Sequence, residues 1–214
     1  METGKKNEYV RINVITTLCC LVPMVVGALF YSKLPAKLPV HFGVSGSADR
    51  YASKEIPLFV IPLGLLALQI LVCFISSKSK EKKGMSYKLQ VLERVLIPVI
   101  ATFIQIITIT SGLHSGNDMN RLITVSVGVL FLVIGNFLPK CKQNAHLGIK
   151  IYTTLRSEEN WNKTHRMAGF VWVIGGLLIM GSSYFDNLVV ACAIIISVVV
   201  LPIVYSLAYG VKTK

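Results

Sequence analysis

The chain has 214 residues, of which 53% are hydrophobic and only 15% are charged, and its mean hydropathy is +0.64. These values exclude an ordinary soluble domain, because so few polar residues could not cover a core of that size. The formal net charge of +12 would suit nucleic-acid binding, but the basic residues are dispersed over several segments with little aromatic interleaving. No direct nucleic-acid partner is therefore expected.

Six apolar runs are each long enough to cross a hydrocarbon core of about 30 Å as a helix. They cover approximately residues 14–32, 57–75, 95–113, 122–138, 167–185 and 188–209, and none of them contains Asp, Glu, Lys, Arg or His. The first run lacks a convincing small-residue cleavage site, so we expect a retained span rather than a signal peptide. The sequence predicts an all-α membrane protein, a six-transmembrane-helix bundle with the lipid bilayer as its partner.

Lys and Arg lie mostly on one side of this predicted bundle. One side has Lys5, Lys6, Arg11, Lys78, Lys80, Lys82, Lys83, Lys88, Arg94, Lys140, Lys142, Lys150, Arg156, Lys163, Arg166, Lys212 and Lys214. The other side has Lys33, Lys37, Arg50, Lys54 and Arg121. This asymmetry predicts that both termini are cytoplasmic, because basic residues are enriched in cytoplasmic loops.

The cysteines indicate neither a disulfide nor a metal site. Cys19, Cys20, Cys73 and Cys192 lie inside predicted spans as small apolar residues, and Cys141 faces the reducing cytoplasm. No pair has the spacing of zinc ligands. We expect no metal, no cofactor and no catalytic residue.

The first external loop, residues 33–56, belongs to a predicted N-terminal half, residues 1–113. Two prolines stiffen the start of this loop, and glycine, serine and aspartate supply turn residues, so a small hairpin-like cap is expected. His41 and Asp49 alone are an incomplete metal-ligand set. The candidate external recognition residues are Pro39, His41, Phe42, Gly46, Asp49, Arg50 and Tyr51. A turn-rich connector without a binding role is the alternative.

The longest polar stretch, residues 135–169, belongs to the predicted C-terminal half, residues 114–214, whose cytoplasmic loop covers residues 139–166. Asn136 and Pro139 should end the fourth helix, and Gly148 permits a backbone turn. Ser157 is a predicted N-cap of a helix that begins near Glu158 and continues through Arg166 into the fifth span. Glu158, Trp161 and His165 should share one face of that helix, with Trp161 at the headgroup level. The stretch is therefore an interfacial anchor or a cytoplasmic docking surface.

Two long motifs carry a resemblance to known proteins. The string Leu34-Pro35, Pro39-Val40-His41-Phe42, Gly46, Asp49-Arg50-Tyr51 and Ser53-Lys54 resembles an uncharacterised domain at the N-terminus of many bacterial membrane proteins. The string Gly135-Asn136, Pro139-Lys140, Asn144, Gly148-Ile149-Lys150, Thr154-Leu155, Glu158, Trp161, Thr164-His165-Arg166 and Gly169 is similar to the signature of the SdpI family. Both motifs occur in the expected order and cover most of the chain.

The resemblance implies an integral membrane protein that confers immunity to a secreted toxic peptide and holds a cytoplasmic repressor at the membrane. The chain departs from the family pattern where Lys150, Ile151 and Thr153 replace Arg, Thr and Trp. These changes remove a guanidinium fork and an indole. The candidate docking or switch residues are Asn136, Asn144, Gly148, Lys150, Thr154, Glu158, Trp161 and Arg166.

The spans also bear on other function classes. An ion-coupled transporter normally needs an ionisable side chain within the membrane, and the predicted spans contain none. An intramembrane enzyme would need a zinc motif, paired acids or an activated serine, and no such pattern is present. An immunity or signalling protein is favoured, and a facilitative exporter without ion coupling is the alternative. We expect the segment from Asn144 to Arg166 to contribute little to helix burial, so that polar substitutions there cost roughly 1 kcal/mol each.

The predicted orientation can be tested by single-cysteine labelling of intact cells with a membrane-impermeant reagent. A probe at Ser47→Cys should react, because residue 47 is expected outside, and Cys141 should not react. Labelling of Cys141 from outside would overturn the orientation.

Overall fold

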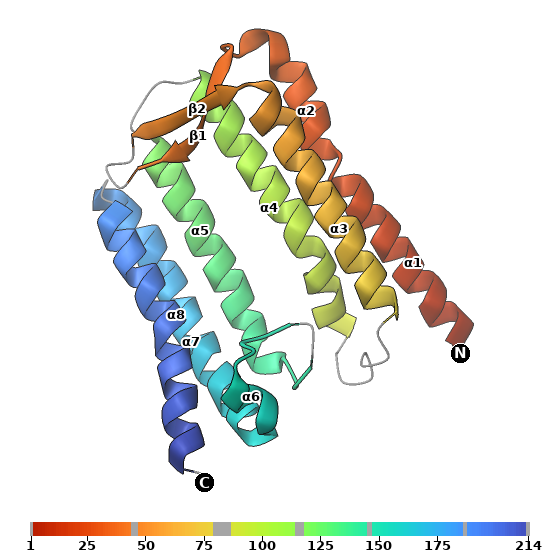
Figure 1. Ribbon diagram of the computed structural model, residues 1–214, viewed down its shortest axis with the longest axis vertical. Coiled ribbons are helices and arrows are strands. Elements are labelled where there is room, and N and C mark those ends of the chain that lie inside the picture. The colour runs from red at the N-terminus through yellow and green to blue at the C-terminus, as the bar shows by residue number, and fades with distance from the viewer. Residues whose placement is uncertain are drawn as a thin grey trace. The chain divides into compact units, whose positions relative to one another are not determined.

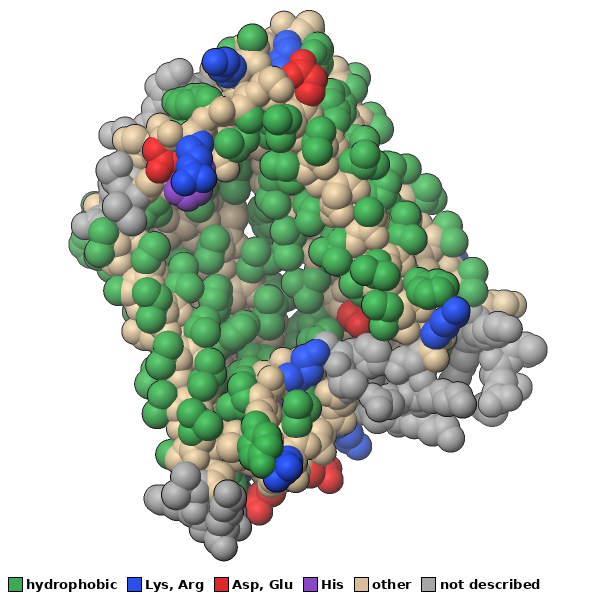
Figure 2. Space-filling view, viewed as in Figure 1, with side chains coloured by type: hydrophobic (Ala, Val, Ile, Leu, Met, Phe, Trp, Pro, Cys, Tyr) green, Lys and Arg blue, Asp and Glu red, His purple; other side chains and the backbone are tan. Residues whose placement is uncertain are grey.

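The computed structural model describes residues 2–43, 47–78, 87–113, 118–144, 147–185 and 188–212. Six of its helical segments are long and apolar enough to cross a membrane, and they are Asn7–Lys33, Ile56–Lys78, Tyr87–Leu113, Met119–Lys140, Glu158–Phe185 and Leu188–Gly210. Figure 2 shows hydrophobic side chains along the helices and charged side chains near helix ends. The prediction of a six-span helical membrane protein is confirmed.

The described residues form two compact units. The first contains α1 (Glu2–Cys19), α2 (Val22–Phe30), η1 (Tyr31–Lys33), the strands β1 (Lys37–Phe42) and β2 (Ala48–Ser53), η2 (Ile56–Val60), α3 (Ile61–Lys78) and most of α4 (Tyr87–Leu113). The second contains most of α5 (Asp118–Phe137), η4 (Leu138–Lys140), α6 (Tyr152–Arg156), α7 (Glu158–Ser182), η5 (Ser183–Phe185) and α8 (Leu188–Lys212).

The loop between α2 and α3 is an antiparallel hairpin in the first unit (Figure 1). Its register shifts between Pro39 and His41, so the strand bends at Val40. Leu38 points inward and is fully buried in an apolar cluster that includes Ile109 of α4. A methyl group at Gly112 would lie 2.5 Å from the Leu38 side chain, which shows how closely the hairpin sits on α4. The expected hairpin-like cap is present.

Lys54 fastens the end of this hairpin to its beginning. Its Nζ donates to the carbonyls of Tyr31 at 2.8 Å and Leu34 at 3.3 Å, and lies 3.9 Å from the centre of the Tyr31 ring. The Tyr31 hydroxyl donates to Glu55 Oε1 at 2.5 Å, and this hydrogen bond lowers the pKa of Glu55. The two ends of the loop are therefore joined by side chains as well as by strand pairing.

Pro98 lies inside α4 and has no N–H to donate to the carbonyl of Arg94, one turn earlier. Gln69 of α3 replaces the missing donor, because its Nε2 lies 3.0 Å from that carbonyl oxygen. The same Nε2 donates to Thr16 Oγ1 of α1 at 3.0 Å. A single amide thus joins three helices of the first unit.

Arg94 itself is fully buried in the same region, where charged side chains were not expected. Its Nε donates to Asn13 Oδ1 at 2.6 Å, and its Nη1 donates to the Gln90 carbonyl at 2.5 Å. Glu93 Oε2 lies 3.5 Å from Nη1, and Glu93 Oε1 accepts from Ser76 at 2.8 Å. The helix begins at Tyr87, eight residues before the predicted span, because these polar side chains find partners on neighbouring helices. The absence of charge holds for the predicted ranges but not for the longer helix.

In the second unit, α5 and α7 meet at two pairs of glycines. A methyl group at Gly128 would lie 2.7 Å from the carbonyl oxygen of Gly176, and one at Gly176 would lie 2.7 Å from that of Gly128. Gly135, seven residues later in α5, and Gly169, seven residues earlier in α7, form a second such pair, with distances of 3.1 and 2.9 Å. Only glycine allows two backbones to approach this closely, a known device of membrane helix packing.

Pro202 creates the same backbone problem in α8 as Pro98 does in α4. It cannot donate to the carbonyl of Val198, and the indole Nε1 of Trp172 on α7 donates to that oxygen at 2.9 Å. The Trp172 ring also packs against Phe131, with ring centres 4.8 Å apart. Side chains from neighbouring helices therefore satisfy both freed carbonyls.

The Trp172 bond can be measured by a double-mutant cycle in detergent-solubilised protein. Trp172→Phe should lower the free energy of unfolding by about 1 kcal/mol, because the Val198 carbonyl loses its donor. In a Pro202→Ala background the loss should be smaller by the contribution of the hydrogen bond, since the restored backbone N–H takes the same carbonyl and only the loss of ring packing remains. An equal loss in both backgrounds would show that the hydrogen bond contributes nothing.

Candidate functional site

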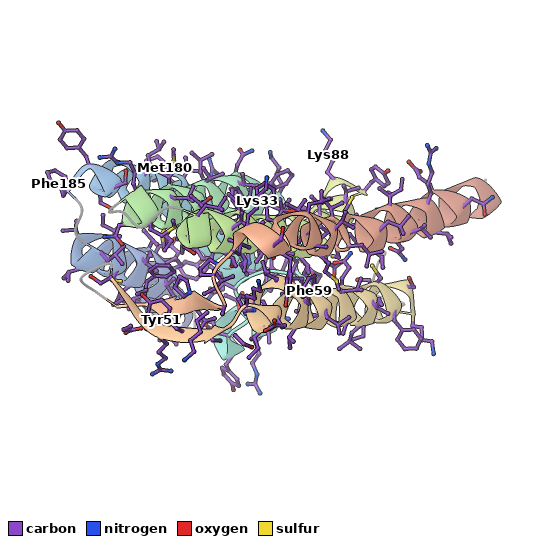
Figure 3. The ribbon with its side chains drawn as sticks, turned by 90° about the horizontal axis from the view of Figure 1, so that it is seen from above. Lys33, Tyr51, Phe59, Lys88, Met180 and Phe185 are labelled. Carbon is purple, nitrogen blue, oxygen red and sulfur yellow. The ribbon has the colours of Figure 1, made fainter. Side chains whose placement is uncertain are left out.

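The hairpin carries the residues predicted for external recognition. His41, Asp49, Arg50 and Tyr51 are exposed, and Figures 2 and 3 show charged and histidine side chains on the hairpin and Tyr51 at its surface. Pro39 and Phe42 are half-buried, and Gly46 lies outside the described residues. His41 Nδ1 lies 2.6 Å from Asp49 Oδ1. Among the described residues, no group of three or more His, Cys, Asp or Glu could hold a metal ion.

Trp161 is the centre of the second candidate site. Its side chain is 0% exposed, and its indole Nε1 donates to the Cys141 carbonyl at 2.6 Å. The ring stacks on His165 with centroids 4.1 Å apart and planes inclined by 16°. Trp161 therefore holds the segment that precedes α7 against α7. It is buried and does not face the headgroups as predicted.

His165 fixes the backbone on the other side of this stack. Its Nδ1 lies 2.8 Å from the Trp161 carbonyl, which can only accept, and its Nε2 accepts the Ile149 N–H at 2.9 Å. These two bonds require the neutral imidazole with its proton on Nδ1. His165 therefore has a structural role in this arrangement, as both ring nitrogens are occupied.

Gly148 is the position where the chain passes over the two rings. Its φ of 133° is a conformation that L side chains rarely adopt, as the sequence predicted for a turn. A methyl group there would lie 2.5 Å from His165 Nε2 and 2.7 Å from the Trp161 ring. Both the backbone and the packing therefore require glycine.

Asn144 and Thr154 hold the segment around this turn. Asn144 Oδ1 accepts from the Leu147 N–H at 2.8 Å, and its Nδ2 donates to the Lys142 carbonyl at 2.7 Å. Thr154 is fully buried, and its hydroxyl accepts from the Ile151 N–H at 3.0 Å and lies 2.7 Å from the Ile149 carbonyl, to which it can donate. These contacts make Asn144 an amide that fixes the loop. We call Cys141, Asn144, Gly148, Thr154, Trp161 and His165 the motif core.

A second set of buried polar side chains joins α6, α7 and α8, and sequence reasoning missed it. Asn160 Oδ1 accepts from Thr164 at 2.9 Å and from the Ser206 hydroxyl at 2.8 Å, while its Nδ2 donates to the Ser206 carbonyl at 2.9 Å. Thr153 of α6 lies 2.6 Å from the Ser206 hydroxyl. The spacing of Asn160 and Thr164 by four residues could have indicated a shared face, but nothing in the sequence connects them to Ser206.

The eight residues predicted for docking separate into two groups. Asn144, Gly148, Thr154 and Trp161 lie in the motif core. Asn136, Lys150, Glu158 and Arg166 are exposed. The expectation that this segment contributes little to burial is wrong, because the motif core includes fully buried side chains.

The start of α7 follows the prediction closely. Ser157 caps the helix, since its side chain accepts from the Asn160 N–H at 3.1 Å, and Glu158 and Glu159 occupy the first turn. Glu158 does not share the buried face of Trp161. Lys163 pairs with Glu159 at 2.9 Å and also donates to the Tyr209 hydroxyl of α8 at 2.7 Å.

The departures from the family pattern occupy different environments. Lys150 is exposed, and the Ile151 backbone N–H is held by Thr154. Thr153 packs against α8, where a methyl group at Gly210 would lie 2.9 Å from its side chain. The small threonine therefore fits a close contact between α6 and α8.

These features define a multi-pass helical membrane protein with an ordered hairpin and a polar segment that is folded onto the fifth span. Residues 140–210 match the SdpI/YfhL protein family, and residues 18–66 match the domain of unknown function DUF1648. The chain is 23% identical to Immunity protein SdpI of Bacillus subtilis (strain 168) over 196 residues, which cover 92% of this chain and 93% of that protein. No solved structure matches the chain. The resemblance predicted from the motifs is confirmed, and with the six spans it indicates a protein of the bacterial cell membrane.

Substitutions of buried and of exposed motif residues should have different effects on the free energy of unfolding. Trp161→Ala should lower the free energy of unfolding by about 3–5 kcal/mol, because it removes a fully buried ring and the donor to Cys141. Glu158→Ala should change it by less than about 0.5 kcal/mol, since the side chain is exposed. Denaturant unfolding in detergent checks both values, and similar losses in the two variants would contradict the assignment of a buried core.

The buried motif core also changes how membrane orientation should be probed. Cys141 is only 3% exposed, and burial raises the pKa of its thiol, so it would resist labelling from either side of the membrane. Lys142 is the adjacent exposed position. Lys142→Cys is therefore the better partner for Ser47→Cys in the labelling experiment.

Proposed function

We propose that this protein protects the cell against a membrane-active toxic peptide and recruits a cytoplasmic repressor to the membrane. The similarity to Immunity protein SdpI over nearly the whole of both chains supports the first part. In this proposal the hairpin is the external recognition surface. The exposed members of the predicted docking set, Asn136, Lys150, Glu158 and Arg166, are the cytoplasmic docking surface.

The observation that carries this proposal is the division of the SdpI-like motif into buried and exposed residues. The buried residues use their polar atoms on one another and on the backbone, as Trp161, His165 and Asn144 do. They hold a fixed shape and leave the exposed residues to meet a partner. Such a surface suits recognition, because a fixed shape holds the exposed charges in place for contact with a partner and needs no chemical step.

A binding role also agrees with the chemistry of the motif core. His165 has both ring nitrogens occupied, so it is not available as a general base. Cys141 is buried with a raised pKa, which disfavours the thiolate needed for a nucleophile. We therefore propose protection without turnover of the peptide.

The proposal is tested by expressing the protein in a sensitive host and challenging it with a panel of membrane-active peptides. Survival should rise with expression, and purified protein in liposomes should leave the protective peptide chemically unchanged. Modification of the peptide at a rate proportional to protein concentration would contradict a binding role. Lack of protection against every peptide of the panel would count against the immunity function.

The docking surface is tested by removing exposed charge without touching the motif core. Glu158→Gln combined with Arg166→Gln should abolish repressor recruitment while leaving thermal stability unchanged, because both side chains are exposed. The charge-retaining pair Glu158→Asp with Arg166→Lys is the matched control and should keep recruitment. A reporter gene under the repressor measures the outcome, and full recruitment by the glutamine pair would exclude these positions.

A further inference from the structure

The short helix α6 buries a polar side chain and exposes apolar ones. Thr154 is fully buried, and Thr153 faces Ser206 of α8. Tyr152 is 62% exposed, and Leu155 is 51% exposed. Arg156 is also exposed, with its guanidinium 4.2 Å from the centre of the Tyr152 ring. An outward face of tyrosine, leucine and arginine suits an environment that is part apolar and part anionic.

The position of α6 in the chain places this face beside the membrane. The fourth span ends at Lys140 and the fifth begins at Glu158, so the segment between them is attached to the bilayer at both ends. From Lys140 to Ser157 the sequence contains Lys140, Lys142, Lys150 and Arg156 but no Asp or Glu. This charge is complementary to an anionic lipid surface.

The backbone of α6 is also prepared for a poorly hydrated environment. Gln143 Nε2 donates to the carbonyls of Thr154 at 2.8 Å and Leu155 at 2.9 Å, which are among the last of the helix. The Thr154 hydroxyl serves the first turn, where it accepts from the Ile151 N–H. These side chains satisfy two carbonyls and one N–H at the ends of the helix without water, which suits a position in the headgroup region.

We propose that the outward face of α6, formed by Tyr152, Leu155 and Arg156, lies against the headgroups of anionic phospholipids. Leucine and the tyrosine ring enter the boundary between headgroups and acyl chains, and Arg156 and Lys142 contact phosphates. The interfacial anchor that the sequence assigned to Trp161 is thereby moved to α6. A soluble protein partner could cover this face instead. Lipid is favoured, because the segment is attached to membrane spans at both ends.

The proposal is tested with the full-length protein in liposomes. An environment-sensitive fluorophore is attached at Leu155→Cys in a background where the exposed cysteines are removed by Cys19→Ala and Cys192→Ala. The labelled protein is placed in phosphatidylcholine bilayers with and without phosphatidylglycerol, and lipids with a headgroup nitroxide quench the probe. The same background without Leu155→Cys retains the buried cysteines and measures unspecific labelling.

Quenching should be stronger in bilayers that contain phosphatidylglycerol. Arg156→Gln and Lys142→Gln should each shift the balance between quenched and solvent-exposed probe by about fivefold toward the solvent. A probe that is solvent-exposed in both bilayers would overturn the proposal and leave a protein partner as the cover. Equal quenching in both bilayers would overturn the assignment to anionic lipid.

Discussion

The fold depends on the requirement that every backbone carbonyl inside a membrane helix finds a donor. Pro98 in α4 and Pro202 in α8 break that rule locally, because neither can donate a backbone N–H. Gln69 donates to the carbonyl freed by Pro98, and Trp172 donates to the one freed by Pro202. These two side-chain hydrogen bonds therefore allow Pro98 and Pro202 to lie inside membrane helices. They also join helices that lack a hydrophobic driving force toward one another in lipid.

The requirement that buried backbone groups find hydrogen-bond partners also shapes the polar segment between the fourth and fifth spans. Trp161 and His165 supply an apolar stack together with a donor and an acceptor for backbone atoms that would otherwise be buried without partners. The segment thus carries its own small core. Its charged residues remain on the outside because nothing in that core could neutralise them.

Patterns that depend on local chemistry could be predicted from the sequence, and patterns that depend on tertiary partners could not. The six spans, the Ser157 cap and the turn at Gly148 follow from apolar length, capping and the conformational freedom of glycine. The burial of Trp161 was missed because tryptophan next to a span usually marks the lipid interface. Arg94 and Ser206 were missed because their partners, Asn13 and Asn160, lie on helices remote in sequence.

The paired glycines of α5 and α7 restrict how the second unit can move. Each carbonyl of the pair Gly128 and Gly176 occupies the space that a side chain would need on the opposite helix, and the pair Gly135 and Gly169 repeats this seven residues away. Sliding one helix along the other by a single turn would bring larger side chains into both contacts at once. The two helices are therefore fixed in register. A displacement at one end of α7 must reach its other end by tilting or rotation of the helix pair, because α7 cannot slide along its own axis past α5.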